Sequence, residues 1–311
     1  MSFSPEHSAK IKAAALKLGF DDAGITDAKI PEEDIARYNA WLENGYHAKM
    51  SYMKSRYDMR LDPQKLFPGV RSVIVLLQAY YNEDLPGYPY KIARYAVGKD
   101  YHKRLKKRLK KLQASIQEIT GKSFVSRPFV DSAPVLERSL AVKAGLGWIG
   151  KNTCLIHPKL GSYVFIAELF TDLDLVPDTN HVKNRCGTCT RCINACPAQA
   201  LSKNGLDARR CISYHTIETR TAIPRTVAEG MQKWVFGCDI CQEVCPWNRN
   251  INARVDTDFL PAKHINYINI DILKSMNDKQ FRQIFAGTAF LRAGRIKLLK
   301  NIEAVKTGGS Q

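Results

Sequence analysis

Residues 186–197 read CGTCTRCINACP, and this stretch decides how the chain is organised. Its cysteines have the spacing C-x2-C-x2-C-x3-C-P that is typical of bacterial ferredoxins, and they are Cys186, Cys189, Cys192 and Cys196. Three closely spaced thiolates can bind three corners of a 4Fe-4S cube, whereas the fourth cysteine of such a run normally ligates a second cube. The motif therefore predicts a partner motif elsewhere in the sequence.

A second motif, CDICQEVCP at residues 238–246, matches that expectation but lacks one cysteine of the full set. Cys211 stands alone upstream and is the candidate for the missing ligand, so that eight thiolates serve two cubes. We assign one cluster to Cys186, Cys189, Cys192 and Cys245. We assign the other cluster to Cys196, Cys211, Cys238 and Cys241.

A pair of structural zinc sites is the alternative, because C-x2-C occurs in both motifs. Zinc does not account for the spacing followed by proline in both halves, so we expect two 4Fe-4S clusters. Such clusters transfer electrons and perform little chemistry of their own. The first 170 residues should therefore hold the site that consumes the electrons.

Charge and composition indicate the kind of partner. Lys and Arg outnumber Asp and Glu by 47 to 30 in the 311 residues, a net charge of +17, which favours nucleic acid as a partner. The sequence contains no run of about 18–20 apolar residues that would cross a membrane. Residues 1–12 lack the apolar stretch of a signal peptide. We therefore expect a cytoplasmic protein with reduced thiols.

Helical and strand patterns are mixed in the first 170 residues, which indicates an α/β or α+β domain, and we expect the α+β class. Helices are expected at 8–18 and 100–119, and strands at 22–25, 72–79, 127–130 and 162–170. The expected domains are residues 1–175, which hold the catalytic site, residues 176–250, which hold the clusters, and a basic, mainly helical segment at 251–311.

Asp131 follows a predicted strand, where functional residues often lie. The alternative is a helix cap, because Asp131 and Ser132 could equally begin a helix that continues to residue 144. The glycine-rich stretch GLGWIGKN follows at residues 145–152. A helix is expected before it and a strand after it, which is the wrong order for a dinucleotide site, and Asn152 replaces the Ser or Thr of a P-loop. A loop that approaches a ligand and a plain helix-to-strand connection both remain possible.

The ordered set of motifs resembles the epoxyqueuosine reductase family over about residues 8–300. The matching segments are FVDSAPVLERSLAVKAGLGWIGKNTCLI, GSYVFIAEL, CGTCTRCINACPAQAL, RCISYHT and FGCDICQEVCPWN. The resemblance implies a cobalamin-dependent enzyme with two 4Fe-4S clusters, which reduces epoxyqueuosine to queuosine in the anticodon wobble position of tRNA. It also implies a nitroreductase-like cobalamin-binding domain followed by a bacterial ferredoxin-type domain. Longer members carry helical repeats after the cluster domain, and this chain is expected to be a short form without them.

The same resemblance implies roles for single residues. Asp131 occupies the family's proton-donor position, and Arg220 lies in a loop that would contact tRNA. The implied cobalamin contacts are Arg60, Asp131, Lys151, Asn152, Leu155, Ile166, Ser213 and Asp239. The sequence from Asp100 to His102 matches only half of the DxHxxG cobalamin motif, because Leu105 replaces its glycine. We therefore expect a base-off cofactor with no lower histidine ligand.

Clusters of basic residues supply candidate phosphate contacts. Lys103 and Lys107 belong to a run of seven cations on the predicted helix 100–119, and a solvated helix face is the alternative explanation of that run. Further cations in the C-terminal segment could also engage phosphates, and they are Arg292, Arg295, Lys297 and Lys300.

These features favour a monomeric tRNA-modifying oxidoreductase that is supplied by an external low-potential electron donor. Reduction of an epoxide to an alkene needs two electrons, two protons and an acid for the departing oxygen, and Asp131 fits that acid. One alternative is a dehalogenase-like corrinoid reductase that acts on a small molecule. The other is a ferredoxin-type electron carrier, which has no need of an acid at a strand end.

Overall fold

The computed structural model describes residues 3–82, 87–251 and 256–308 and divides into two compact units. The first unit comprises Met1–Asn44, Ser51–Ala79 and Tyr101–Thr188. The second comprises Gly45–Met50, Tyr80–Asp100 and Cys189–Gln311. Residues 252–255 and 309–311 of the predicted C-terminal segment lie outside the described residues. The division of the chain at residues 175 and 250 stays a prediction.

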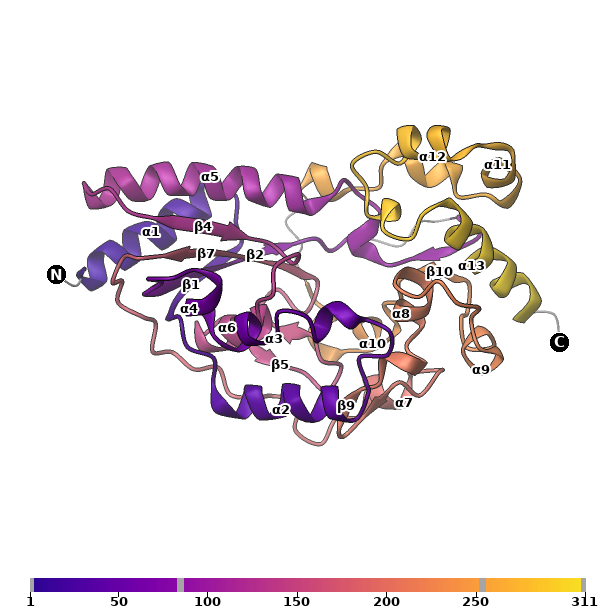
Figure 1. Cartoon of the computed structure of the whole chain (residues 1–311), viewed down its shortest axis with the longest axis horizontal. Helices are drawn as coiled ribbons and strands as arrows, with labels where there is room; N and C mark the ends of the chain where they lie inside the picture. The colour runs from indigo at the N-terminus through magenta and orange to yellow at the C-terminus, as the bar shows by residue number, and fades with distance from the viewer. Residues whose placement is uncertain (1–2, 83–86, 252–255, 309–311) are drawn as a thin grey trace. The chain divides into compact units, whose positions relative to one another are not determined.

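A four-stranded antiparallel sheet forms the centre of the first unit (Figure 1). Its strands, in spatial order, are β1 (Asp22–Asp27), β2 (Ser72–Ala79), β7 (Val164–Thr171) and β4 (Ser126–Phe129). Every residue of β2 is buried, as its sequence SVIVLLQA predicts for a strand that is covered on both faces. The α+β class and the four predicted strands are confirmed, with ends shifted by a few residues.

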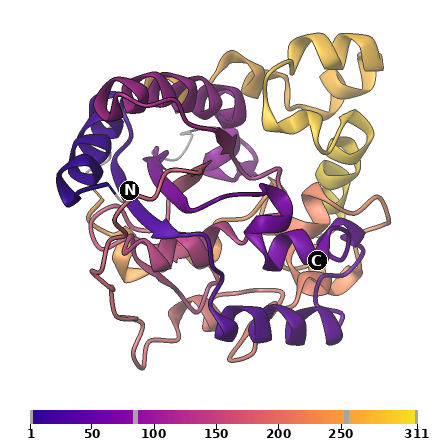
Figure 2. The same ribbon diagram turned by 60° about the vertical axis from the view of Figure 1, so that its left-hand side comes forward.

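Helices cover both faces of this sheet. Alternate residues of β2, among them Val73 and Val75, pack in one apolar cluster with Leu140 of α6 (Glu137–Lys143). On the opposite face, α1 (Pro5–Lys17) and α5 (Tyr101–Thr120) lie side by side (Figure 1 and Figure 2). The apolar stripe predicted for α5 is completely buried, and it consists of Leu105, Leu109, Leu112 and Ile116.

Shorter elements complete the first unit. The helices are α2 (Glu32–Glu43), α3 (Tyr57–Leu61) and α4 (Pro63–Leu66). A small antiparallel pair, β5 (Trp148–Ile149) and β6 (Leu155–Ile156), follows α6 and encloses the end of the glycine-rich stretch. The helix before this stretch and the strands after it match the order that the sequence predicted.

The second unit is built from short elements around two apolar clusters. Its strand pairs are β3 (Lys91–Ile92) with β10 (Trp234–Phe236), and β8 (Leu201–Ser202) with β9 (Gly205–Leu206). Its helices are α7 (Arg191–Asn194), α8 (Ile212–Ile217), α9 (Arg225–Ala228), α10 (Ile240–Glu243), α11 (Ile270–Ser275), α12 (Asp278–Ile284) and α13 (Arg295–Gly308). Phe236 of β10 contacts Phe290 with ring centroids 4.4 Å apart, which joins the C-terminal helices to this unit. Among the described residues, no helix has both the length and the apolar character needed to span a bilayer.

The helix that was predicted to begin at Ser132 begins instead at Glu137. Pro134 explains the difference, because proline disfavours helical backbone at the residue before it. The chain from Asp131 to Leu136 is therefore irregular, and neither Asp131 nor Ser132 caps α6. The cap interpretation of Asp131 was wrong.

A carboxyl group lies inside the sheet of the first unit. Glu168 of β7 is completely buried, and neither carboxyl oxygen has a hydrogen-bond partner among the described residues. Burial and the neighbouring carboxyl of Glu137 raise the pKa of Glu168 well above its ordinary value of 4.5. Glu168 therefore keeps its proton to a higher pH than an exposed glutamate does.

The stability of Glu168→Gln, compared with that of the wild type, should increase as the pH rises. A raised pKa means that the stabilising contribution of this group is complete below about pH 4.5 and is lost as the pH rises through the folded-state value. Gln has a similar size and does not titrate, so the Tm of Glu168→Gln relative to wild type should rise as the pH increases above about 4.5, the ordinary pKa of a glutamate. Thermal unfolding followed by circular dichroism measures this difference. Glu118→Gln, at an exposed position of α5, is the matched control. A Tm difference for Glu168→Gln that does not vary with pH would contradict the raised pKa of Glu168.

Candidate active site and cluster-binding cysteines

Asp131 lies where the chain leaves the sheet. Strand β4 pairs with β7 so that Phe129 is opposite Glu168, and the same register continued would bring Asp131 alongside Ile166. Asp131 has a φ of +55°, a left-handed conformation that non-glycine residues adopt at a cost of about 1 kcal/mol or more. Such a conformation persists only when surrounding contacts hold it. The position of this aspartate is therefore fixed by its partners.

Three groups hold Asp131. The hydroxyl of Tyr101 donates to its Oδ2 at 3.0 Å, and Nε2 of His102 lies 3.3 Å from the same oxygen. The backbone N–H of Asp131 donates to Oε1 of Glu137 at 2.5 Å. The side chain of Asp131 is nevertheless 60% exposed, so its carboxyl remains accessible to a substrate. Because Oδ2 accepts from Tyr101, the proton of a protonated Asp131 is carried by the other oxygen, Oδ1.

Aromatic stacking orients the first two partners. The ring of Tyr101 stacks on Phe165 of β7 at 4.0 Å and on His102 at 4.2 Å. In the sequence, His102 stands out only as part of an incomplete cobalamin motif, and no pattern marks Tyr101 as a contact of Asp131. Tyr101 lies 30 residues and His102 29 residues before Asp131, in the first turn of α5. A local sequence pattern cannot predict a contact over this separation.

Glu137 links Asp131 to the sheet. Burial and the nearby charge of Asp131 raise the pKa of Glu137 above its ordinary value, and its carboxyl also faces Glu168. The sequence analysis missed Glu168, because a single glutamate among the apolar residues of β7 suggests an outward-facing side chain. Its burial shows instead that both faces of β7 are covered.

The chain just after the GKN turn contacts the first turn of the same helix. Arg138, next to Glu137, donates to the carbonyl of Thr153, which joins the first turn of α6 to this loop. Asn152 is buried, and its Oδ1 accepts from the backbone N–H of Cys154 at 3.2 Å. Lys151 donates to the carbonyl of Gly187 at 2.8 Å. The first turn of α6 therefore connects Asp131 with the glycine-rich loop.

The remaining predicted contacts of the first unit come from separate elements. Arg60 of α3 is buried, and its Nε has no hydrogen-bond partner among the described residues, although another guanidinium nitrogen donates to the carbonyl of Tyr52 at 3.3 Å. Leu155 is buried in β6, and Ile166 is half-buried in β7. The pairing of β4 with β7 ends at Phe129, which is opposite Glu168. The edge of β7 at Ile166 is therefore not paired with β4.

Three of the predicted cluster ligands lie together in the second unit. The charges of Cys196 and Cys211 both raise the pKa of the Cys238 thiol, and the charge of Cys196 raises the pKa of the Cys211 thiol, so the three sulfurs are neighbours. Burial raises the pKa of the Cys211 and Cys238 thiols above the ordinary value. Backbone N–H groups point at these sulfurs, for example that of Ala200 at 3.2 Å from Sγ of Cys196. N–H donors around buried sulfurs fit thiolates that ligate an iron–sulfur cluster.

The other predicted ligands are placed on neighbouring elements. Cys192 belongs to α7 and Cys241 to α10, and these two helices pack together. Cys189 and Cys245 belong to the same unit, whereas Cys186 belongs to the first. Within the described residues, no three His, Cys, Asp or Glu side chains lie close enough to hold one metal ion. A 4Fe-4S cube binds each thiolate through a different iron, so its ligands do not need to meet at one ion.

Ser213 and Asp239 flank these cysteines. The backbone N–H of Ser213, on α8, points at the sulfur of Cys211 and opposes the rise in the pKa of this thiol. Asp239 is buried, and its Oδ2 accepts from the backbone N–H of Arg94 at 2.7 Å. Burial raises the pKa of Asp239 to about 6, although the charge of Arg94 opposes the shift. The buried Arg94 also pairs with Glu243 at 2.8 Å, and no local sequence pattern marks this contact.

The predicted tRNA contacts differ in their surroundings. Lys103 and Lys107 are exposed, one turn apart on α5. Arg220 is exposed too, but its guanidinium donates to the backbone carbonyls of Ala293 and Arg292, the latter at 2.7 Å. Its position is therefore fixed, while its charge is not neutralised by these bonds.

Two family profiles match the chain. The profile described as "4Fe-4S double cluster binding domain" matches residues 185–248, which include all eight predicted ligands. The profile described as "Epoxyqueuosine reductase QueG, DUF1730" matches residues 60–132, from Arg60 to the residue after Asp131.

Whole-chain similarities agree with these profiles. The epoxyqueuosine reductase of Cyclobacterium marinum is 44% identical over 318 residues, which cover 100% of both chains. A crystal structure of epoxyqueuosine reductase with a tRNA-Tyr epoxyqueuosine-modified stem loop has a TM-score of 0.87 at 26% identity and covers 97% of this chain and 81% of its own. A Bacillus subtilis epoxyqueuosine reductase, with its catalytic aspartate loop swung out of the active site, has a TM-score of 0.85 at 25% identity and covers 97% of this chain and 82% of its own. This chain belongs to the epoxyqueuosine reductase family.

Proposed function

We propose that this protein reduces epoxyqueuosine to queuosine in the anticodon wobble position of tRNA and that Asp131 is the proton donor. The observation that carries this proposal is the accessible carboxyl of Asp131, which Tyr101, His102 and Glu137 hold at the edge of the sheet. The family membership supports the substrate, and the double-cluster profile supports the supply of electrons. Neither the dehalogenase-like alternative nor the electron carrier is favoured, because the similarity to epoxyqueuosine reductases extends over the whole chain.

The chemistry requires an acid in this position. Conversion of the epoxide to an alkene breaks both carbon–oxygen bonds, consumes two electrons and two protons, and releases the oxygen as water. The oxygen leaves more readily when a positioned acid protonates it. In our proposal Asp131 gives the proton, Tyr101 and His102 orient its carboxyl, and Glu137 keeps its backbone in place. The Glu137–Glu168 pair behind it can hold a further proton.

Cobalamin is the proposed resident cofactor of the first unit. The buried Nε of Arg60 fits an acceptor on such a group, because the amide side chains of a corrin offer carbonyl oxygens. The corrin would also face the edge of β7 at Ile166, which does not pair with β4. Lys151 and Asn152 of the GKN turn belong to the same proposed set. Leu155, Ser213 and Asp239 complete the proposed set. Bound cobalamin would supply low-potential electrons to the substrate.

The proposed cluster ligands keep the two groups that the sequence suggests. The neighbouring thiols of Cys196, Cys211 and Cys238 support their assignment to one cluster, together with Cys241. The other cluster would use Cys186, Cys189, Cys192 and Cys245. We further propose that Lys103, Lys107 and Arg220 contact tRNA and that the reaction takes place in the cytoplasm. The monomeric state, the nitroreductase-like classification of the first unit and the external electron donor stay predictions.

Asp131→Asn should retain cobalamin and both clusters but lose turnover by at least about 100-fold, because the amide cannot donate the proton of a carboxylic acid. The reduced enzyme is incubated with tRNA that carries epoxyqueuosine. Mass spectrometry of the tRNA then measures the conversion of epoxyqueuosine to queuosine. Asp58→Asn is the matched control, since Asp58 lies on exposed α3 with a side chain that is 70% accessible. If Asp131→Asn turns over at the wild-type rate, the acid assignment is wrong.

Cys211→Ala should lose one cluster of two. The anaerobically reconstituted variant should contain about four iron atoms per chain, where the wild type contains about eight. Iron and acid-labile sulfide analysis measures this directly. Cys154→Ala removes the ninth cysteine, which lies outside both motifs, and should leave the iron content unchanged. An iron content near eight in Cys211→Ala would reject the ligand assignment.

A further inference from the structure

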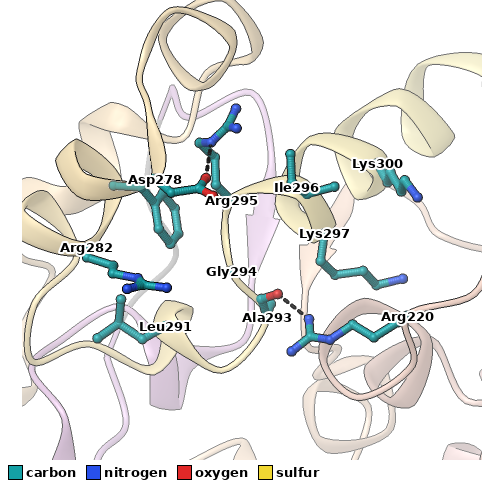
Figure 3. A pocket seen from close by; sticks show the side chains of 11 residues that line it. Arg220, Asp278, Arg282, Leu291, Ala293, Gly294, Arg295, Ile296, Lys297 and Lys300 are labelled. Atoms are coloured by element: carbon teal, nitrogen blue, oxygen red, sulfur yellow. Dashed lines mark hydrogen bonds and ion pairs between the residues drawn. The ribbon is translucent and has the colours of Figure 1, made fainter.

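A cavity of about 500 Å³ lies among the C-terminal helices of the second unit (Figure 3). Residues from α12, from the start of α13 and from the loop after α8 line it. The charged lining residues are Arg220, Asp278, Arg282, Arg295, Lys297 and Lys300. Among the described residues, five cations thus face this space with one carboxylate.

Internal contacts use only part of this positive charge. Arg295 pairs with Asp278 at 2.8 Å, which neutralises one cation. Arg220 is held by neutral backbone carbonyls, so it keeps its full charge at a fixed position. Arg292, which the sequence also suggested as a phosphate contact, pairs with Glu218 at 2.7 Å and is not a lining residue. The remaining positive charge of the cavity therefore resides on Arg220, Arg282, Lys297 and Lys300.

Lys297 is the unusual member of this group. It is only 4% exposed, and its Nζ has no hydrogen-bond partner among the described residues. Its side chain extends between those of Arg220 and Lys300 (Figure 3). Burial and these two charges lower the pKa of Lys297 to about 8. A buried ammonium group that is surrounded by cations is unfavourable in the free protein, and an anion in the cavity would relieve it.

The backbone and the apolar rim also suit an anion with a sugar attached. The cavity lies at the amino-terminal end of the 14-residue helix α13, where the helix dipole favours negative charge. Leu291 and Ile296 line the same space and are 44% and 51% exposed. Such side chains can contact a ribose, whereas an isolated inorganic anion would leave them in water. The net charge of +17 further favours a polyanion.

We propose that this cavity binds a backbone phosphate of the RNA substrate, with Lys297 as its buried cation and Arg220 and Lys300 beside it. The proposal rests on the proposed function, since it locates part of the tRNA on the C-terminal helices. It also distinguishes Lys297, which is buried, from Lys103 and Lys107 of α5, which are exposed.

Binding of an anticodon stem-loop to the full, cluster-loaded protein tests this proposal. The RNA carries no epoxide and is labelled for fluorescence anisotropy, so its binding is measured independently of epoxide reduction. Lys297→Met should raise its Kd by roughly tenfold, since one charged contact is lost. It should also reduce the slope of log Kd against log salt concentration by about one. Lys297→Arg keeps the charge and should retain most of the binding. Lys279→Met, at an exposed position of α12 that does not line the cavity, should match wild type.

Stability separates a binding role from a structural one. If Lys297 serves the ligand, Lys297→Met should keep or raise the Tm of the free protein, because an unpaired buried charge is removed. An unchanged Kd and salt slope in a folded Lys297→Met would overturn the proposal. Competition distinguishes the occupants, since inorganic phosphate and poly-glutamate should displace the RNA only weakly. Poly-glutamate binding that depends on Lys297, without an effect on RNA, would assign the cavity to an acidic protein. If the protein binds RNA through Lys297 but does not reduce the epoxide, the proposed function is wrong and the proposed binding site stands.

Discussion

The hydrogen bond from the backbone N–H of Asp131 to the carboxylate of Glu137 is the contact on which the candidate active site depends. Asp131 has a left-handed backbone conformation and follows a strand whose pairing has already ended, so no regular structure holds it. Glu137 replaces that missing support from the first turn of α6. The next residue, Arg138, bonds to the glycine-rich loop, so a single helix turn positions both parts of the site.

The support of this helix turn is itself electrostatic. Glu168 enters the core next to Glu137, and two carboxyls in a desolvated site favour a shared proton over two negative charges. A comparable arrangement occurs in the second unit, where Arg94 lies between the carboxyls of Asp239 and Glu243 beside Cys238. In both units, buried polar groups surround the residues that the proposed chemistry uses, because apolar packing alone would not fix their direction.

The basic surface is not uniform. Lys103 and Lys107 of α5 are exposed and can contribute to a long-range attraction for RNA, which salt screens strongly. Arg295 and Arg292 are paired with carboxylates and contribute less. Lys297 differs because its charge is desolvated, and a desolvated charge interacts more strongly with a bound phosphate than a hydrated one does. Net charge therefore indicates the class of partner, while burial indicates where a specific contact is made.

Local patterns in the sequence determined the elements and the chemical class of this protein. The cysteine spacing indicated the clusters, SVIVLLQA gave a buried strand at 72–79, and the stripe from Leu105 to Ile116 gave helix α5. Each of these signals depends on residues a few positions apart, which backbone geometry places predictably. The start of α6 was predicted wrongly because the competing effect of Pro134 was not weighed against the capping pattern. Only the tertiary structure brought Tyr101, Glu137 and Glu168 to Asp131 and left Nζ of Lys297 without a hydrogen-bond partner in the part of the chain that the structure describes. Strand register and burial decide these contacts, and both depend on packing between segments that are distant in the chain.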